Sequence, residues 1–425
     1  MEAQASADSD PMLVPPPEAP RRIESWDEAL ALIRAQSPDY VSSAQSVTRA
    51  EAQKRVALAA VLPTLAGQAS YTHQLVTETL TISGAKFVTP PPDVWFAGGT
   101  LAWTLVNPRG IYGVGTSEKA IEVARLSFQD RRRVLATALV DAMLATLAAA
   151  RVAELNRVGL RASLQRLALT NARLQFGQGT ALDVDRAEQD VAAAREGLLT
   201  GDESLRQARE ALGMALGSPV PIAPPAELDI ESFEAAVART CRLNEYVERR
   251  PDVAAARARY NLAERALRDA DLQLAPTFAV GAQLGYASAV LLTTNATWAL
   301  QGVLNLPLYD GGARYGAMRD ARGALEQARQ DLAAARLSAI VESARARRSV
   351  GVLQAARDVA RQRRDLAFRI DGRTRDGYAH GLGTSLDLVV SAEALRQAEI
   401  NLALLEFQVG SARAHAVLTD AECAY

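Results

Sequence analysis

The chain has 425 residues, of which 49% are hydrophobic and only 5% aromatic, and its formal net charge is −2 at pH 7. This near-neutral balance offers no basic surface for nucleic acid, so no nucleic-acid partner is expected. The combination of ample length and few aromatic side chains favours long, closely packed helices over a bulky globular core.

The chain starts with a polar, proline-rich stretch, and we expect a disordered extension over residues 1–22. This stretch contains no basic segment followed by an apolar one, so the given sequence shows no export signal. Taken literally, that start favours the cytoplasm. A signal that has already been removed would leave the same start.

A first structural repeat is predicted over residues 23–221. Its opening helix runs from Pro38 to about Ala60, and Pro63 stops it because proline lacks a backbone donor and clashes with the preceding turn. Two strands follow, at about 61–76 and 94–106. Large apolar side chains alternate with small or polar ones in the second strand, which predicts a sheet with two different faces.

A long helical stretch follows the strands. Residues between Gly113 and Gly177 include no proline, and a continuous helix of that length spans on the order of 95 Å. The turn Gly177-Gln178-Gly179-Thr180-Ala181-Leu182-Asp183, here called the first tip turn, ends it. The returning helix has an apolar residue every seven positions, which favours close coiled-coil packing: Val184, Val191, Leu198, Leu205 and Leu212.

The same order of elements returns over residues 230–425, after a linker at 222–229. Strands are predicted at about 275–287 and 296–308, and a proline-free stretch joins Gly312 to Gly381. The second tip turn, Gly381-Leu382-Gly383-Thr384-Ser385-Leu386-Asp387, lies 381 − 177 = 204 residues after the first. Its seven-residue series is Leu388, Leu395, Leu402 and Val409. One unit has therefore been duplicated, and function is expected at symmetric positions.

The strands allow two interpretations. A soluble sheet packed on helices explains the alternation, and the chain would then be a soluble coiled-coil scaffold or adaptor. Aromatic residues gathered in the strands favour a membrane interface instead, and each strand is long enough to cross a bilayer when tilted: Tyr71, Trp95, Trp103, Tyr286 and Trp298. Four strands cannot close a barrel, and an open edge cannot lie in lipid, so several chains would have to share one barrel.

The duplicated order of helix, two strands, long helix, Gly-x-Gly-Thr-x-Leu-Asp turn and returning helix resembles the TolC-like outer-membrane efflux proteins over nearly everything after Ile23. Pro307-Leu308-Tyr309-Asp310-Gly311-Gly312 at a strand-to-helix junction adds to the resemblance. The resemblance implies a mainly α fold with a β-barrel part, in which a homotrimer shares a twelve-stranded outer-membrane barrel and a long α-helical periplasmic tunnel. The implied function is a passive exit duct for small molecules, or for proteins, and the implied partners are outer-membrane lipid, a periplasmic membrane-fusion adaptor and an inner-membrane pump.

The tip turns carry the candidate functional residues. The spacing of Thr180 with Asp183, and of Thr384 with Asp387, predicts capping boxes at the two returning helices. Threefold symmetry would also place each carboxylate in a ring that attracts cations, and both roles stay open for Asp387.

The resemblance assigns further roles around the second tip turn. It implies that Asp387 forms an entrance ring and that Asp183 and Tyr378 hold the tip closed. It also implies that the tip turns contact the adaptor, through Gly177, Gly179, Thr180, Leu182, Gly381, Gly383, Thr384 and Leu386. The chain departs from the family where Gly383 replaces an arginine and Val390 a second ring aspartate. We expect a weaker or differently built gate, with Arg373 or Arg375 as candidate substitutes for the missing cation.

Other chemistry is not indicated by the sequence. Three scattered histidines give no metal-ligand spacing, so no metal or cofactor is expected, and no nucleophile or phosphate-loop motif points to an enzyme. Cys241 and Cys423 are interpreted either as unrelated buried thiols or as a pair. By the resemblance, both fall in the middle of the tunnel, where an intrachain disulfide is a hypothesis in the oxidising periplasm.

Overall fold

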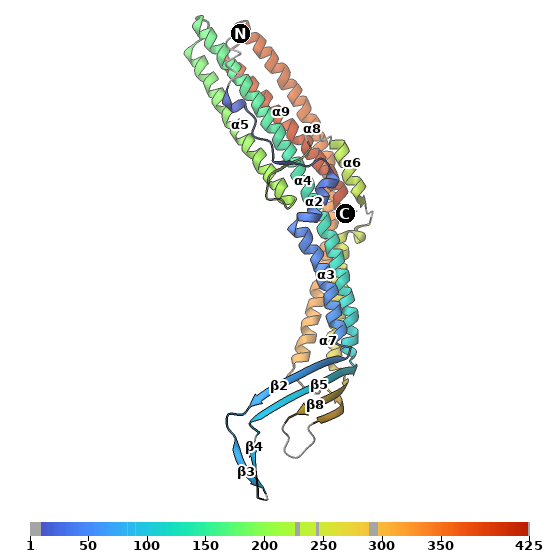
Figure 1. Cartoon of the computed structure of the whole chain (residues 1–425). Coiled ribbons are helices and arrows are strands. Elements are labelled where there is room, and N and C mark those ends of the chain that lie inside the picture. The colour runs from blue at the N-terminus through green and yellow to red at the C-terminus, as the bar shows by residue number, and fades with distance from the viewer. Residues whose placement is uncertain are drawn as a thin grey trace. The chain divides into compact units, whose positions relative to one another are not determined.

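The computed structural model describes residues 10–82, 84–89, 91–225, 230–243, 246–288 and 296–423 (Figure 1). The chain divides into two compact units. The helical unit comprises Met1–Ala44, Ser127–Val253 and Ala335–Tyr425, and the strand unit comprises Gln45–Leu126 and Ala254–Ala334. Neither unit coincides with a sequence repeat, because each unit takes corresponding parts of both repeats.

Two long helices pass through both units. α4 comprises Pro108–Gln175 with 68 residues, and α8 comprises Ala313–Ala379 with 67 residues. The two long predicted helices are therefore confirmed. α4 begins earlier than Gly113, because Pro108 has the fixed φ that suits the first helical position and needs no donor there.

The returning helices are α5 (Ala181–Ala215) and α9 (Ser385–Thr419), each with 35 residues. Burial confirms the seven-residue series in both helices, and its buried members are Val191, Leu198, Leu205, Leu212, Leu388, Leu395, Leu402 and Val409. A Cβ added at Gly201 would lie 2.7 Å from Nδ2 of Asn156 on α4. The absence of a side chain at Gly201 therefore leaves room for Asn156 between α4 and α5.

The main core of the helical unit includes two short helices that sequence reasoning did not find, α2 (Trp26–Gln36) and α6 (Ile230–Thr240). Residues from α2, α4, α5 and α9 meet there, and the most buried are Ile23, Leu30, Ile33, Leu139, Met143, Leu212, Leu216 and Leu418. One window of α4 is long and apolar enough to cross a membrane by length and composition. The burial of Leu139, Val140 and Met143 in this core accounts for that apolar character by packing.

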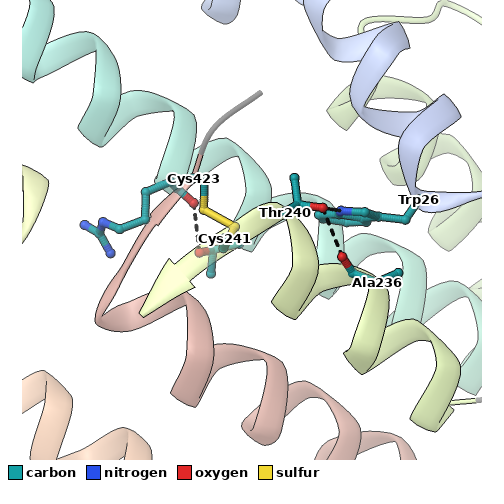
Figure 2. Close-up of a disulfide and its surroundings, with 7 residues drawn as sticks. Trp26, Ala236, Thr240, Cys241 and Cys423 are labelled. Carbon is teal, nitrogen blue, oxygen red and sulfur yellow. Dashed lines mark hydrogen bonds between the residues drawn. A yellow bond between two sulfur atoms is a disulfide. The ribbon is translucent and has the colours of Figure 1, made fainter. Parts of the chain in front are cut away.

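A disulfide joins Cys241 to Cys423 at the edge of this core (Figure 2). The two cysteines face each other across the antiparallel pair formed by β7 (Cys241–Leu243) and β10 (Ala421–Cys423). Nearby, the indole N–H of Trp26 donates to Oγ1 of Thr240 at 3.1 Å, and that hydroxyl donates to the carbonyl of Ala236 at 2.9 Å. The end of the second repeat is thus covalently fixed to its beginning.

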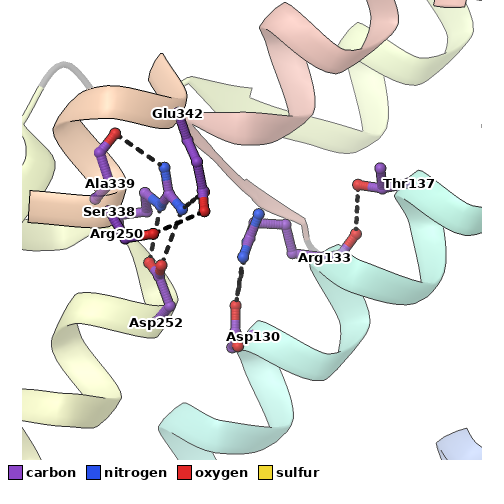
Figure 3. A network of polar contacts seen from close by, with 8 residues as sticks. All are labelled: Asp130, Arg133, Thr137, Arg250, Asp252, Ser338, Ala339 and Glu342. Carbon is purple, nitrogen blue, oxygen red and sulfur yellow. Dashed lines mark hydrogen bonds and ion pairs between the residues drawn. The ribbon is translucent and has the colours of Figure 1, made fainter. Parts of the chain in front are cut away.

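Arg250 forms a buried charge network near the start of α7 (Pro251–Asp271) (Figure 3). Its side chain is 2% exposed and donates to both carboxylate oxygens of Asp252 at 2.9 Å. It also donates to the carbonyl of Ala339 at 3.3 Å and pairs with Glu342 on α8. Bidentate pairing of this kind fits the planar guanidinium and compensates for its removal from water.

The strand unit contains an antiparallel sheet with the order β2-β5-β8-β9. Its strands are β2 (Thr64–His73), β5 (Asp93–Val106), β8 (Thr277–Ala287) and β9 (Ala296–Asn305), close to the four predicted strands. The preceding helices α3 (Pro38–Ala59) and α7 lead into β2 and, through a short 3₁₀ turn at Leu272–Leu274, into β8. The strand order leaves β2 and β9 as the outer strands.

The sheet has the predicted two faces. Directly paired residues lie on the same face, and the pairs Leu65–Leu101, Tyr71–Trp95 and Leu284–Trp298 place exposed apolar side chains on one of them. The rings of Tyr71 and Trp95 are 4.7 Å apart. The other face carries small and polar residues, among them Gln68, Thr100 and Gln283.

The segment that connects β2 to β5 in the first repeat contains a hairpin. It consists of β3 (Glu78–Ile82) and β4 (Ala85–Thr89), which pair antiparallel, and Gly84 between them has a φ of +85°. The corresponding loop of the second repeat falls largely outside the described residues.

The expectation of a disordered extension is wrong for residues 10–22. This segment contains a 3₁₀ turn at Pro11–Leu13 and the strand β1 (Arg21–Arg22), which pairs in parallel with β6 (Ile222–Ala223). The physical reason is that Leu13 and Ile23 are apolar anchors that the prolines keep extended between them, and both are buried. β6 also occupies the beginning of the predicted linker, whose residues 226–229 lie outside the described part.

Candidate functional site

The two tip turns have the same backbone structure. In the first, the N–H of Gln178 donates to the carbonyl of Arg173 at 2.8 Å and the N–H of Gly177 to that of Leu174 at 3.0 Å. In the second, Leu382 and Gly381 donate to Gly377 and Tyr378 at 2.9 and 3.0 Å. This pattern is a Schellman motif, which needs a left-handed residue, and Gly177 and Gly381 have φ values of +70° and +76°.

Both predicted capping boxes are present. The N–H of Thr180 donates to Oδ2 of Asp183 at 2.9 Å, and the N–H of Asp183 donates to the Thr180 hydroxyl at 3.3 Å. Thr384 and Asp387 repeat these bonds at 3.1 and 3.2 Å. Each aspartate therefore satisfies backbone donors that a helix start leaves free.

The two aspartates differ in what else they contact. The other carboxylate oxygen of Asp183 accepts a hydrogen bond from the Ser385 hydroxyl in the second tip turn, and Arg186 reaches the same hydroxyl at 3.4 Å. The bond from Ser385 is the largest cause that lowers the pKa of Asp183. Asp183 thus links the two tip turns within one chain.

Asp387 instead is exposed to solvent. Bonds from the hydroxyl and the N–H of Thr384 lower the pKa of its carboxyl group, so Asp387 stays ionised at neutral pH. Val390, one turn further along α9, is also exposed. At this end of α9 the capping carboxylate is therefore exposed, and an exposed apolar side chain lies beside it where the resemblance implies a second carboxylate.

Tyr378 is only 5% exposed and lies under a cation. The guanidinium of Arg173 is 4.4 Å from its ring centroid, and Nη1 of Arg173 donates to its carbonyl at 2.7 Å. Sequence reasoning missed Arg173. The available signal was its place in the last turn of α4, where a cation favours the helix end and can reach a neighbouring carbonyl.

The suggested substitutes for the missing family arginine do not lie at Tyr378. Arg375 pairs with Asp371 at 2.6 Å within α8, and Asp371 also accepts a bond from Ser391 at 3.4 Å. Arg373 is exposed. At Gly383 itself, an added Cβ would lie 3.3 Å from the backbone nitrogen of Tyr378, so this turn is too tight to take an arginine without a shift.

A further contact joins the two hairpins away from the tips. Asn156 on α4 donates to the carbonyl of Gly197 on α5 at 2.7 Å and accepts from Nη1 of Arg396 on α9 at 3.2 Å. The α4–α5 hairpin and the α8–α9 hairpin of one chain are therefore linked by Asp183–Ser385, Arg173–Tyr378 and Asn156–Arg396. Further from the tips, Asp141 of α4 accepts a hydrogen bond from the hydroxyl of Ser411 on α9 at 3.0 Å.

The surface of the tips is apolar as well as acidic. Side chains from both tip turns and the adjoining helix ends are exposed, namely Phe176, Leu182, Leu382 and Leu386. Exposed apolar groups rimmed by polar residues are typical of a surface that contacts another protein.

Comparisons with known proteins point in one direction. A sequence profile of the family described as outer membrane efflux protein matches residues 29–218 and 243–415. A relative described as the pyoverdine export outer membrane protein OpmQ of Pseudomonas putida is 23% identical over 397 residues, which cover 89% of this chain and 82% of the relative.

Two solved structures show the fold. The outer membrane protein VceC of Vibrio cholerae matches with a TM-score of 0.75 and 21% identity, covering 92% of this chain and 95% of VceC. The open state of the MtrE outer membrane channel of Neisseria gonorrhoeae matches with a TM-score of 0.75 and 18% identity, covering 92% and 88%.

Proposed function

This chain belongs to the outer membrane efflux protein family, and from that premise we propose that three copies form one exit duct that takes its cargo from a periplasmic adaptor and an inner-membrane pump. Membership makes the chain an efflux channel of the cell outer membrane. The family consists of channel proteins. The number of copies, the partners and the roles of the tip residues are our proposals.

The observation that carries the trimer is the four-stranded sheet with two open edges. Its apolar face is exposed, and a sheet edge in lipid would leave backbone groups without partners. The strands alternate in direction, so β9 of one copy can pair antiparallel with β2 of the next. Three copies give 3 × 4 = 12 strands, the number that the resemblance implies.

The helical hairpins supply the tunnel wall. Burial of the seven-residue series inside each hairpin leaves other faces of α4, α5 and α8 free to meet the next copy. The exposed apolar residues of α8 support such contacts, and they include Val352, Val359, Leu366 and Ile370.

The tip would act as both filter and gate. Three copies of Asp387 would form an exposed, ionised ring that attracts cations and repels anions. Contacts between the two hairpins of one chain, among them Arg173–Tyr378 and Asp183–Ser385, would hold the tip closed, and loosening them would let it open. Adaptor contact with the exposed apolar tip residues would drive that opening.

Cargo choice belongs to the pump in this proposal. The relative OpmQ is described as exporting pyoverdine, and a small molecule of that size could pass a wide tunnel. The side chains of the tip turns form no enclosed pocket for a particular molecule within the part of the chain described here. The duct would therefore serve any small molecule that its pump delivers.

Single-particle microscopy of the detergent-purified protein tests the assembly. We expect hollow cylinders with threefold symmetry and a detergent belt at one end, and a protein mass of three chains by native mass spectrometry. Particles without a belt, or a protein that stays monomeric and needs no detergent, would overturn the proposed duct.

A further inference from the structure

The N-terminal arm, residues 10–20, lies on the first hairpin and not on the second. Leu13 is 9% exposed and packs against Leu160 of α4 and against Val191, Ala194 and Leu198 of α5. We call the surface formed by these four residues, together with Arg195 and Arg209, the arm groove.

Polar contacts fix the arm on either side of Leu13. Oδ2 of Asp10 pairs with Nη2 of Arg195 at 2.8 Å, while its other oxygen accepts from the N–H of Met12 at 2.9 Å. Further along, Nη1 of Arg209 donates to the carbonyl of Pro17 at 2.8 Å. The prolines at 15, 16 and 17 hold the segment extended, so little chain entropy is lost between these contacts.

The duplicated hairpin does not offer the same chemistry. The repeat displacement of 204 places Glu399 of α9 where α5 has Arg195 (195 + 204 = 399). An aspartate in the position of Asp10 would meet a carboxylate there instead of a guanidinium. The arm therefore distinguishes the two hairpins, and a ring of three copies would carry three arm grooves alternating with three hairpins that have a carboxylate at the position of Arg195.

We propose that the arm groove is a docking site for the adaptor and that the N-terminal arm guards it by occupying it. The structure defines the segment that the groove accepts: an extended stretch with a carboxylate, an apolar side chain three residues later and a free carbonyl further on. An adaptor segment with these groups displaces the arm. This inference rests on the proposed function, because it adds a second adaptor contact to the one proposed at the tips.

The arm can be displaced because its contacts are few. Only one apolar side chain is fully inserted. In the Asp10–Arg195 pair the Arg195 side chain stays 47% exposed although that of Asp10 is 10% exposed, so water screens the pair in part. A tethered segment gains its occupancy from an effective concentration on the order of millimolar. An adaptor segment that makes more contacts with the arm groove than the arm does can displace the arm in spite of this effective concentration.

A synthetic peptide of residues 10–20 serves as the probe. It is titrated against the detergent-purified wild-type trimer and against a release variant with Asp10→Asn and Leu13→Ser, and binding is read by fluorescence anisotropy. We expect the release variant to bind the peptide at least about tenfold more tightly than the wild type, whose groove is already filled.

Two variants make the test specific. Val14→Ser changes the neighbouring residue of the arm, which is 70% exposed, and should leave peptide binding at the wild-type level. Arg195→Gln added to the release variant should abolish the gain. Equal peptide binding to the wild type and the release variant, or no binding to the release variant, would overturn the proposal.

A measurement of adaptor binding tests this inference separately from the proposed function. Surface plasmon resonance compares the adaptor of the same efflux system on wild-type and release-variant trimers. Tighter binding to the release variant supports the guarded groove. Equal binding to both overturns the groove while leaving the duct intact, and no binding to either removes adaptor docking from the proposed function, whatever the peptide shows.

Discussion

Arg173 rests on the ring of Tyr378, with 4.4 Å between guanidinium and ring centroid, and so the end of α4 is tied to the end of α8. The contact does not use the tyrosine hydroxyl, because Arg173 donates to the main-chain carbonyl. Within one chain, a cation on an aromatic face therefore joins the two helix ends at the tip.

Arg173→Gln should loosen the closed tip. A cation–π contact contributes about 0.5–2 kcal/mol, so the ratio of open to closed channels should rise roughly 2- to 30-fold in planar-bilayer recordings. Tyr378→Phe is the matched control, because it keeps both the ring and the carbonyl. If Tyr378→Phe opened the channel as much as Arg173→Gln, the hydroxyl and not the ring contact would hold the tip.

Asp387→Asn should lower the preference for cations over anions, because it removes the exposed charge of the proposed entrance ring. The matched variant is Asp183→Asn, which removes the equivalent capping carboxylate but one that also bonds to Ser385. We expect Asp183→Asn to change gating more than selectivity. Reversal potentials in a salt gradient measure the difference, and unchanged selectivity in Asp387→Asn would exclude the ring role.

Cation preference should persist in mild acid. The pKa of Asp387 is lowered by its bonds to Thr384, so the carboxylate is charged throughout the range above the ordinary aspartate value near 4. The charge of Asp387 and its helix cap are present at higher pH and are lost as the pH falls through the lowered pKa. Selectivity that fades already between pH 6 and 5 would point to a different group, and Thr384→Val should shift the loss to higher pH.

Replacing Cys241 and Cys423 by serine should lower stability. A disulfide that closes a loop with a sequence separation of 182 residues contributes roughly 2–5 kcal/mol, mainly by restricting the unfolded chain. Thermal unfolding of the oxidised protein should therefore shift down on adding reductant. The double serine variant is the control, since its unfolding should not respond to reductant at all.

Arg250→Met should be destabilising. It leaves the carboxylates of Asp252 and Glu342 without their shared partner. Because these side chains are 23% and 48% exposed, water compensates part of the loss, and the cost lies below the roughly 3–5 kcal/mol of a fully buried pair. Arg268→Gln in α7 provides the comparison, because its pair with Glu264 is exposed and contributes less than about 1 kcal/mol. Denaturant titrations of both variants test the contrast.

Much of the fold was readable from the sequence because it depends on local patterns. Proline positions bound the helices, a period of seven marked α5 and α9, and a period of two marked the strands. The Gly-x-Gly-Thr turns predicted both caps. A left-handed glycine ends one helix, and a Thr–Asp pair caps the start of the next.

The missed features depend on contacts between distant segments. Arg173 is one of many arginines, and only the folded chain shows that it lies against Tyr378, 205 residues away. Arg375, one of the two candidate substitutes named from the sequence, pairs with Asp371 one turn away. The arm was misread because proline-rich composition indicates disorder on average, whereas Leu13 and Asp10 find partners in α5.

The disulfide gives the second repeat an unusual topology. With Cys241 bound to Cys423, the backbone between them is a closed covalent ring that contains both strands and both long helices of that repeat. A protease that cuts one peptide bond inside this ring releases no fragment. In gel electrophoresis without reductant, chains cut once inside this ring would therefore run as a single species of full mass. A reductant would separate them into two fragments.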